Sequence, residues 1–206
     1  MDIDLSLLNM NKGQLYESII TSKNEVGEKN AAPFGVTCRG NDEIMLKIFK
    51  GSKSLENILK TKKFIVNITS NPLYFTQATI DTIDSIYFEE NNSLKDSDAY
   101  FECEVIEIKE ATRKDSIKIS EAMIIIAKVT SITINKKYTK ALNRAIYSLI
   151  ESLVDFSRID IVDENTREDY IIKFKKSKRL IFKVGSKEEK ESIKLVENKL
   201  KEKGFI

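Results

Sequence analysis

The first third of the chain alternates apolar and polar residues with the two-residue period of β-strands. Together with its β-favouring residues, this pattern predicts strands over 15–21, 29–38, 43–49 and 63–69. Short turns rich in Gly, Asn and Asp separate the first three strands, which indicates antiparallel neighbours. A helical stripe over 52–60 follows the third strand, and Pro72 begins a turn or short helix after the fourth.

Two longer strands are predicted over 101–109 and 123–134, after a polar loop over 81–99. In each strand the apolar positions change phase once, after Val105 and after Val129. Such a change indicates a β-bulge, and bulges bend the strands of small closed barrels. Five or six antiparallel strands joined mostly by short turns therefore predict a mainly β fold, a small barrel.

Beyond residue 135 the apolar period lengthens to that of an α-helix. The spacing predicts a helix over 138–157 and another over 187–203, which ends at Gly204. Between them, residues 166–184 form a basic segment interleaved with apolar residues, of helical or extended conformation. We therefore expect a barrel domain over 1–135 and a C-terminal helical domain over 136–206.

Composition narrows the chemistry that the chain can perform. There is no histidine, which excludes Ser-His-Asp and Cys-His catalysis and the usual zinc sites. The charges of the 34 basic and 32 acidic residues nearly cancel, so nucleic-acid binding is not expected. The acidic residues of the loop over 81–99 indicate solvated surface rather than a metal site. No apolar run is long enough to span a membrane, and the acidic N-terminus is unlike a signal peptide, so we expect a cytoplasmic protein. In that compartment we expect Cys38 and Cys103 to be reduced and buried.

The strand over 29–38 carries the first candidate binding feature. Asn30, Ala31, Ala32 and Pro33 have little side-chain bulk, and Pro33 cannot donate a ladder hydrogen bond. Gly35 allows another group to approach the backbone closely. A flat aromatic ring lying on this strip is one interpretation; an edge strand with small residues beneath a neighbour is the other.

The turn after the strand over 43–49 carries the second feature. Gly51, Ser52, Lys53 and Ser54 lead into a helix that continues through Asn57. Free N–H groups at a helix start, two hydroxyls and two lysines, Lys50 included, would suit a phosphate; the alternative is an ordinary helix N-cap. Strip and turn are joined by one strand, so a ligand with both a ring and a phosphate, such as flavin mononucleotide (FMN), is physically sensible.

The order of these motifs resembles a known family. The segments N-A-A-P-F-G-V, K-G-S-K-S-L-E-N-I, F-I-V-N-I-T and N-P-L-Y-F resemble those of an archaeal domain of unknown function, family 447. That family belongs to the FMN-binding split barrels, the flavin reductase-like group. The resemblance implies a six-stranded antiparallel split barrel with a C-terminal helical part, FMN as cofactor, and a homodimer with FMN near the subunit interface.

The resemblance also implies roles for particular residues. Asn30, Ala31, Ala32 and Pro33 would line the flavin ring, while Phe49 and Lys50 would lead to the phosphate end. Gly51, Ser52, Lys53, Ser54 and Asn57 would hold the phosphate. Asn67 and Thr69, on the polar face of their strand, would reach the ring or the ribityl chain.

Three functions follow from these expectations. The first is a cytosolic FMN-dependent oxidoreductase, with a nicotinamide or another electron donor and an unknown substrate. The second is a non-catalytic flavin carrier or sensor that uses the same pocket. The third is a flavin-free interaction module whose basic tail binds RNA or an acidic protein.

Overall fold

The computed structural model describes residues 3–80, 83–114 and 119–206. The chain divides into two compact units, Met1–Leu142 and Asn143–Ile206. In the part of the chain that is described, no helix combines the length and the apolar character needed to cross a membrane.

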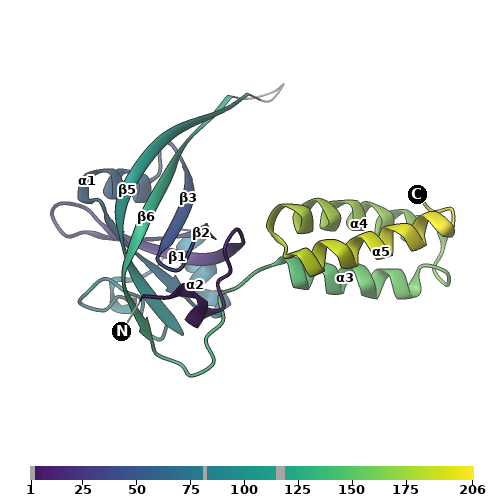
Figure 1. Cartoon of the computed structure of the whole chain (residues 1–206), viewed down its shortest axis with the longest axis horizontal. Helices are drawn as coiled ribbons and strands as arrows, with labels where there is room; N and C mark the ends of the chain where they lie inside the picture. The colour runs from purple at the N-terminus through teal and green to yellow at the C-terminus, as the bar shows by residue number, and fades with distance from the viewer. Residues whose placement is uncertain (1–2, 81–82, 115–118) are drawn as a thin grey trace. The chain divides into compact units, whose positions relative to one another are not determined.

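The first unit is a closed barrel of six antiparallel strands, which confirms the predicted fold class (Figure 1). Alternate residues of every strand point inward and form one apolar core, with Ile20, Leu46, Phe101 and Ile125 fully buried. Around the barrel the strands follow the order β1 (Leu15–Lys23), β2 (Lys29–Cys38), β3 (Glu43–Phe49), β6 (Ile119–Ile134), β5 (Ala99–Lys114) and β4 (Lys63–Ile68), which returns to β1.

β5 and β6 form a long two-stranded ribbon that continues beyond the pairing of β6 with β3 (Figure 1). Their register shifts twice, leaving Ile106 of β5 and Thr130 of β6 without a ladder partner. Both extra residues lie where the apolar pattern changes phase, so the predicted bulges are confirmed. The strands themselves extend further than the sequence pattern indicated.

Two helices of the barrel unit begin with side-chain caps. α1 (Lys53–Thr61) starts at Ser52, whose Oγ accepts the Leu55 N–H, and its Leu55 and Ile58 join the barrel core. α2 (Pro72–Thr79) has Pro72 in its first turn, as predicted, and packs against β2. Within the expected loop over 81–99, the described residues form a short 3-10 helix, Ser85–Tyr87; residues 81–82 lie outside the described part.

The predicted helix over 138–157 was wrong at its N-terminal end, because α3 spans Ala145–Arg158. The residues before it belong to the barrel unit: Ala141 N–H donates to Leu8 O (3.1 Å), and Glu17 N–H donates to Leu142 O (2.7 Å). Asn143 Oδ1 then accepts the Ala145 N–H at 2.8 Å, where the helix begins. Apolar spacing alone does not reveal that these backbone groups are already paired.

The second unit consists of α3, α4 (Glu164–Val184) and α5 (Lys187–Glu202). The basic segment over 166–184 is therefore helical. Ser186 forms a capping box with Glu189, and Gly204 follows the last helix with a φ of 73°. The core of this unit is made by Leu149, Phe174, Ile181, Val184, Ile193, Val196 and Leu200.

Candidate functional site

The barrel has an opening beside β2. This strand pairs with β1 over Lys29–Thr37 but with β3 only over Val36–Cys38. Residues 29–35 therefore present one strand edge that no described strand covers. Pro33 lies within this open edge, which accounts for a proline in the middle of a barrel strand.

The register identifies which backbone groups face the opening. Glu17 N–H donates to Leu142 O, and Ile19 O accepts from Asn67 Nδ2 at 3.0 Å, so both residues direct their backbone groups away from β2. Their partners on β2, Gly35 and Pro33, must then direct their own backbone groups away from β1. By the same alternation, Ala31 also directs its backbone groups away from β1. The open edge thus offers N–H and C=O groups of Ala31 and Gly35, and the C=O of Pro33.

The predicted flat strip needs a correction, because neighbouring side chains point to opposite faces of the sheet. Ala31 is buried in an outer apolar cluster with Ile19, Tyr74 and Leu94. Asn30 and Ala32 point the other way, since Ala32 pairs with the core residue Ile20. What these residues present to the opening is therefore backbone rather than one surface of small side chains.

The group that approaches Gly35 belongs to the protein itself. A Cβ at this position would lie 2.9 Å from Cδ2 of Leu15. A larger residue here would displace the Leu15 side chain, so the close approach predicted from the sequence is made by Leu15 of the neighbouring strand.

The start of α1 lies next to the open edge. Asn30 Nδ2 donates to Ser54 Oγ at 2.8 Å, which ties the end of β2 to the first turn of the helix. Asn57 Nδ2 donates to Ser22 Oγ of β1 at 3.2 Å. Ser54, Asn57 and Ser22 are all buried, so these polar contacts hold α1 in a fixed position at the opening.

A cavity of about 300 Å³ opens between the β1–β2 hairpin and α1. The first amide groups of a helix have no hydrogen-bond acceptor within the helix. In α1, the Leu55 N–H donates to the capping residue, Ser52 Oγ, at 3.3 Å. The positive end of the α1 dipole and the Lys53 side chain therefore lie beside the cavity. Its lining consists of Asn24, Glu28, Lys29, Asn30, Lys53, Glu56 and Asn57.

Phe49 and Lys50 are not part of this cavity. Lys50 Nζ lies 3.2 Å from Glu121 and 3.4 Å from Glu110, both on the β5–β6 ribbon. Its hydrogen bond with Glu121, followed by the charge of Glu110, raises the pKa of Lys50. Phe49 is 58% exposed on the outer face of β3, with Lys47 Nζ 5.7 Å from its ring centroid. Both residues therefore face the ribbon and the solvent rather than the start of α1.

Asn67 is fully buried, and protein groups use its whole carboxamide. Nδ2 donates to Ile19 O at 3.0 Å and to Thr21 Oγ1 at 3.1 Å. Oδ1 accepts the Leu94 N–H at 2.8 Å. The predicted face of β4 is correct, but both amide hydrogens are taken, so this geometry does not favour a contact with flavin.

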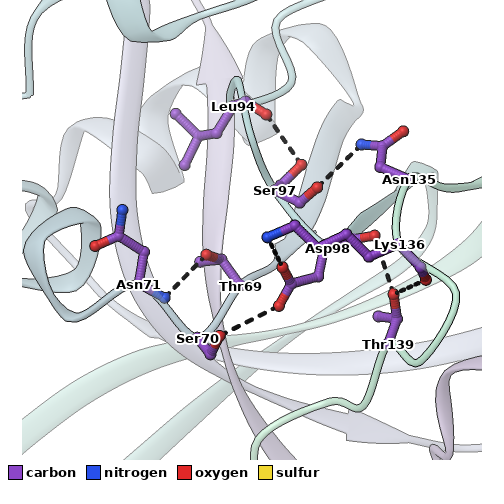
Figure 2. Close-up of polar contacts among 9 residues, drawn as sticks. All are labelled: Thr69, Ser70, Asn71, Leu94, Ser97, Asp98, Asn135, Lys136 and Thr139. Atoms are coloured by element: carbon purple, nitrogen blue, oxygen red, sulfur yellow. Dashed lines mark hydrogen bonds and ion pairs between the residues drawn. The ribbon is translucent and has the colours of Figure 1, made fainter.

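Thr69 lies at one end of a polar cluster around Asp98 (Figure 2). Its Oγ1 accepts the Asn71 N–H at 3.1 Å, at the start of α2. Asp98 accepts from Lys136 Nζ at 2.5 Å and from Ser70 Oγ at 3.4 Å, while its backbone O accepts from Thr139 Oγ1 at 3.0 Å. The contacts of Asp98 join the ends of β4, β5 and β6, while Thr69 fixes the turn that leads into α2.

The structure thus brings together only part of the predicted site. Asn30, Ser52, Lys53, Ser54 and Asn57 meet at the opening, with Gly51 in the turn before them at a φ of 89°. Sequence reasoning missed two contributors. Ser22 lies opposite Asn30 in the β1–β2 hairpin, and Lys29 lines the cavity. Counting residue pairs outward from the turn at Asn24–Gly27 would have placed Ser22.

The arrangement suits an anion joined to a flat polar group. A helix start and a lysine attract a phosphate, although Glu28 and Glu56 limit the positive field of the cavity. The open β2 edge supplies backbone donors on either side of an acceptor, which matches the alternating hydrogen-bonding edge of a heterocycle. These two features lie one hydrogen bond apart, at Asn30 and Ser54.

Two family models match the chain. Residues 16–135 match the family described as "Protein of unknown function (DUF447) N-terminal domain", and residues 143–198 match the model described as "Protein of unknown function (DUF447)". Among curated proteins, the "Uncharacterized protein MJ1453" of Methanocaldococcus jannaschii is 28% identical over 182 residues, covering 86% of this chain and 93% of that protein.

Solved structures of similar fold include a relative with a flavin. The crystal structure of the FMN-bound protein MM1853 from Methanosarcina mazei is 25% identical, with a TM-score of 0.54. The match covers 95% of this chain and 99% of that one. The flavoredoxin of Methanosarcina acetivorans is 14% identical with a TM-score of 0.47, covering 65% of this chain and 77% of that one.

Proposed function

The chain belongs to the DUF447 family, and from this premise we propose that it is a flavoprotein that binds FMN at the opening between β2 and α1. The observation that carries this proposal is the hydrogen bond between Asn30 and Ser54, which places a helix start beside an open strand edge. The FMN-bound protein of M. mazei, similar over nearly its whole length, supports the choice of ligand.

The residues present fit the two ends of this cofactor. The α1 start, with Ser52, Lys53 and Ser54, would hold the phosphate through N–H groups and the lysine charge. The backbone of Ala31, Pro33 and Gly35 would meet the polar edge of the ring. Lys50, Asn67 and Thr69 have protein partners, so we leave them out of the proposed site.

We further propose a redox role for the protein. Bound flavin supplies hydride and electron transfer, chemistry that needs no histidine from the chain. The protein would fix the orientation of the ring through the β2 backbone, which is rigid because β1 pairs with it throughout. The electron donor, a nicotinamide or another reductant, would reach the ring from the solvent side.

We propose that the functional form is a homodimer with FMN near the subunit interface. Phe49 is 58% exposed on β3 and Ile106 is 56% exposed on β5, so large apolar side chains lie on the barrel surface near the ribbon. A second subunit would cover these apolar side chains. Sedimentation of the flavin-loaded protein, compared with Phe49→Lys, tests this: the variant should sediment as a monomer.

The absorption spectrum of freshly purified protein tests flavin binding. We expect a flavin spectrum, and chromatography of the released chromophore should identify FMN. Colourless protein that does not quench the fluorescence of added FMN would reject the proposal.

A second measurement separates an oxidoreductase from a flavin carrier or sensor. Under anaerobic conditions the flavin of a reductase should bleach with NADH, NADPH or another physiological donor at a rate that supports turnover. Flavin that bleaches with dithionite but with none of these donors would instead favour a carrier or sensor. Both results leave the FMN site itself in place.

A further inference from the structure

Helix α4 divides by charge into two halves. Residues 164–172 include three acidic residues and one basic residue, whereas residues 173–184 include six basic residues and no acidic one. The near-equal charge totals of the whole chain conceal this segregation. The expectation that the chain does not bind nucleic acid rested on those totals, so it does not apply to the second half of α4 by itself.

Four cations of this half share the face of α4 that points to solvent. Phe174 and Ile181 are buried in the core of the three-helix unit. With about 100° of rotation per residue, the four cations lie on the side of the helix away from these two residues, and all are exposed. This basic face extends about 12 Å along the helix and consists of Lys175, Lys176, Arg179 and Lys183.

Neighbouring carboxylates do not balance the charges of the basic face. Within the described part of the chain, no carboxylate forms an ion pair with any of its four cations. On the side of α5 that contacts α4, Glu197 lies 2.7 Å from Lys178 Nζ and 3.4 Å from Lys201 Nζ. Glu168 and Asp169, on the solvent side of α4, come more than one turn before the basic face. Three more acidic residues of α5 have partners in or beside that helix: Glu189, Glu191 and Glu202.

Helix stability does not account for this arrangement. The C-terminal end of a helix favours basic residues in its last turn, which explains Lys183 but not the three cations before it. Lys175, Arg179 and Lys183 follow one another at intervals of four residues, where like charges repel and destabilise a helix. An anionic polymer bound along the face would relieve this repulsion.

We propose that the basic face binds the phosphate backbone of duplex DNA and does not read its sequence. Lysine and arginine side chains are common donors to phosphate oxygens, and such contacts carry no sequence information. Duplex DNA has one negative charge for about every 1.7 Å of its axis, so a row of cations about 12 Å long meets a phosphate for each of its charges. Release of the counterions around those phosphates favours the complex.

Other anionic partners fit the face less well. Proteins hold single strands by stacking bases on aromatic rings, but Lys178 Nζ and Lys194 Nζ already lie 5.9 and 5.6 Å from the ring centroid of Phe182, beside the face. A helix on a membrane surface inserts its apolar side into lipid, whereas α4 buries Phe174 and Ile181 within the unit. An interface with a protein has an apolar centre, and here the exposed Ile172 lies only at one end.

The salt dependence of DNA binding tests the proposal. Fluorescence anisotropy of the intact protein with a fluorescein-labelled duplex of about 20 base pairs gives the association constant at several KCl concentrations. Plotted on logarithmic axes, this constant should fall with salt with a slope of about −3.6, the value for four phosphate contacts.

A triple variant, Lys175→Gln with Arg179→Gln and Lys183→Gln, removes three of the four contacts. It should bind the duplex about tenfold or more weakly at low salt, and its slope should shrink to about −0.9. Glutamine is a good helix former and the repulsion is gone, so the Tm should be no lower than that of the wild type. Arg179→Gln alone should change the slope by about 0.9.

The matched control removes the same charge from lysines that have carboxylate partners. Lys199 pairs with Glu202, Lys201 with Glu197, and Lys203 with Asp160. The variant with Lys199→Gln, Lys201→Gln and Lys203→Gln should keep the wild-type slope, and its affinity should change by no more than about twofold. Equal losses of affinity and slope in both triple variants would reject the basic face, because net charge alone would then explain the binding.

Three further outcomes would overturn the proposal. The first is wild-type protein that does not bind the duplex at low salt. The second is single-stranded RNA of the same length that binds more tightly than the duplex. The third is binding to vesicles that contain phosphatidylserine without binding to DNA, which would assign the face to a membrane surface. Absorption spectra of the same samples report FMN separately, so neither result depends on the proposed flavin site.

Discussion

Two polar clusters flank the first strands of the barrel, and they differ in how fully protein groups occupy them. Around Asn67 and Asp98, carboxamide, carboxylate and hydroxyl groups have partners on β1 and in the loops between strands. Around Asn30 and Asn57, the described residues supply one partner for each carboxamide, and a cavity of about 300 Å³ lies alongside.

The difference separates structural polar residues from binding residues. A buried polar group that is fully paired contributes to the stability and uniqueness of the fold, and it has no capacity left for a ligand. A polar group held by one contact beside a cavity is fixed in position yet open to a ligand. Substitutions in the first cluster should therefore change stability, and substitutions in the second should change affinity.

The largest expected effect is on stability, from Asn67→Leu. The substitution removes three buried hydrogen bonds and leaves the Leu94 N–H and the Ile19 C=O without their side-chain partner. We expect a loss of about 3 kcal/mol in the free energy of unfolding, from about 1 kcal/mol for each bond. In thermal unfolding this is a fall of about 6–12 °C in Tm.

Asn67→Leu also tests whether this cluster is purely structural. Flavin affinity of the remaining folded protein, measured by fluorescence quenching at low temperature, should equal that of the wild type. A specific loss of affinity without a loss of Tm would contradict the distinction between the two clusters and return Asn67 to the flavin site.

The next effect is on affinity, from Lys53→Ala combined with Ser54→Ala. The double change removes a charge at the α1 start and the hydroxyl that accepts from Asn30. We expect FMN affinity to fall by about 2 kcal/mol, close to thirtyfold in Kd, because charge-assisted hydrogen bonds to the phosphate weaken. Fluorescence titration at two salt concentrations measures it, and the variant should show the weaker salt dependence.

Lys60→Ala is the matched control for that variant. It removes the same charge from the last turn of the same helix, where Lys60 Nζ lies 3.7 Å from Glu25. Its FMN affinity should stay at the wild-type value, since a helix C-terminus does not attract a phosphate. Equal losses in Lys60→Ala and in the double variant would indicate a general charge effect instead of a phosphate site at the α1 start.

Local patterns revealed one cluster better than the other. Gly51 and the hydroxyls after it are neighbours in sequence, so the helix start and its cap were predictable, and the phase changes marked the bulges at Ile106 and Thr130. The role of Asn67 depends on Leu94, which is distant in sequence. Similarly, the partners of Lys50 come from another part of the chain, Glu110 and Glu121.

The smallest effect is a pH dependence in the fully paired cluster. The hydrogen bond to Asp98 raises the pKa of Lys136 above its ordinary value of 10.5 (Figure 2). A raised folded-state pKa means that the charged lysine stabilises the fold below 10.5, and that this contribution is lost as the pH rises through the folded-state pKa. The effect should be small because the Lys136 side chain is 61% exposed.

Denaturant unfolding of the wild type and Lys136→Met, from neutral pH to above 10.5, measures this contribution. The wild type should be slightly more stable at neutral pH, and the two curves should converge in the alkaline range. Lys140→Met, which removes an exposed lysine nearby, should show no such convergence. Parallel curves for Lys136→Met would mean that the ion pair with Asp98 adds nothing, and that the hydrogen bonds of Thr139 and of the backbone alone hold this end of the barrel.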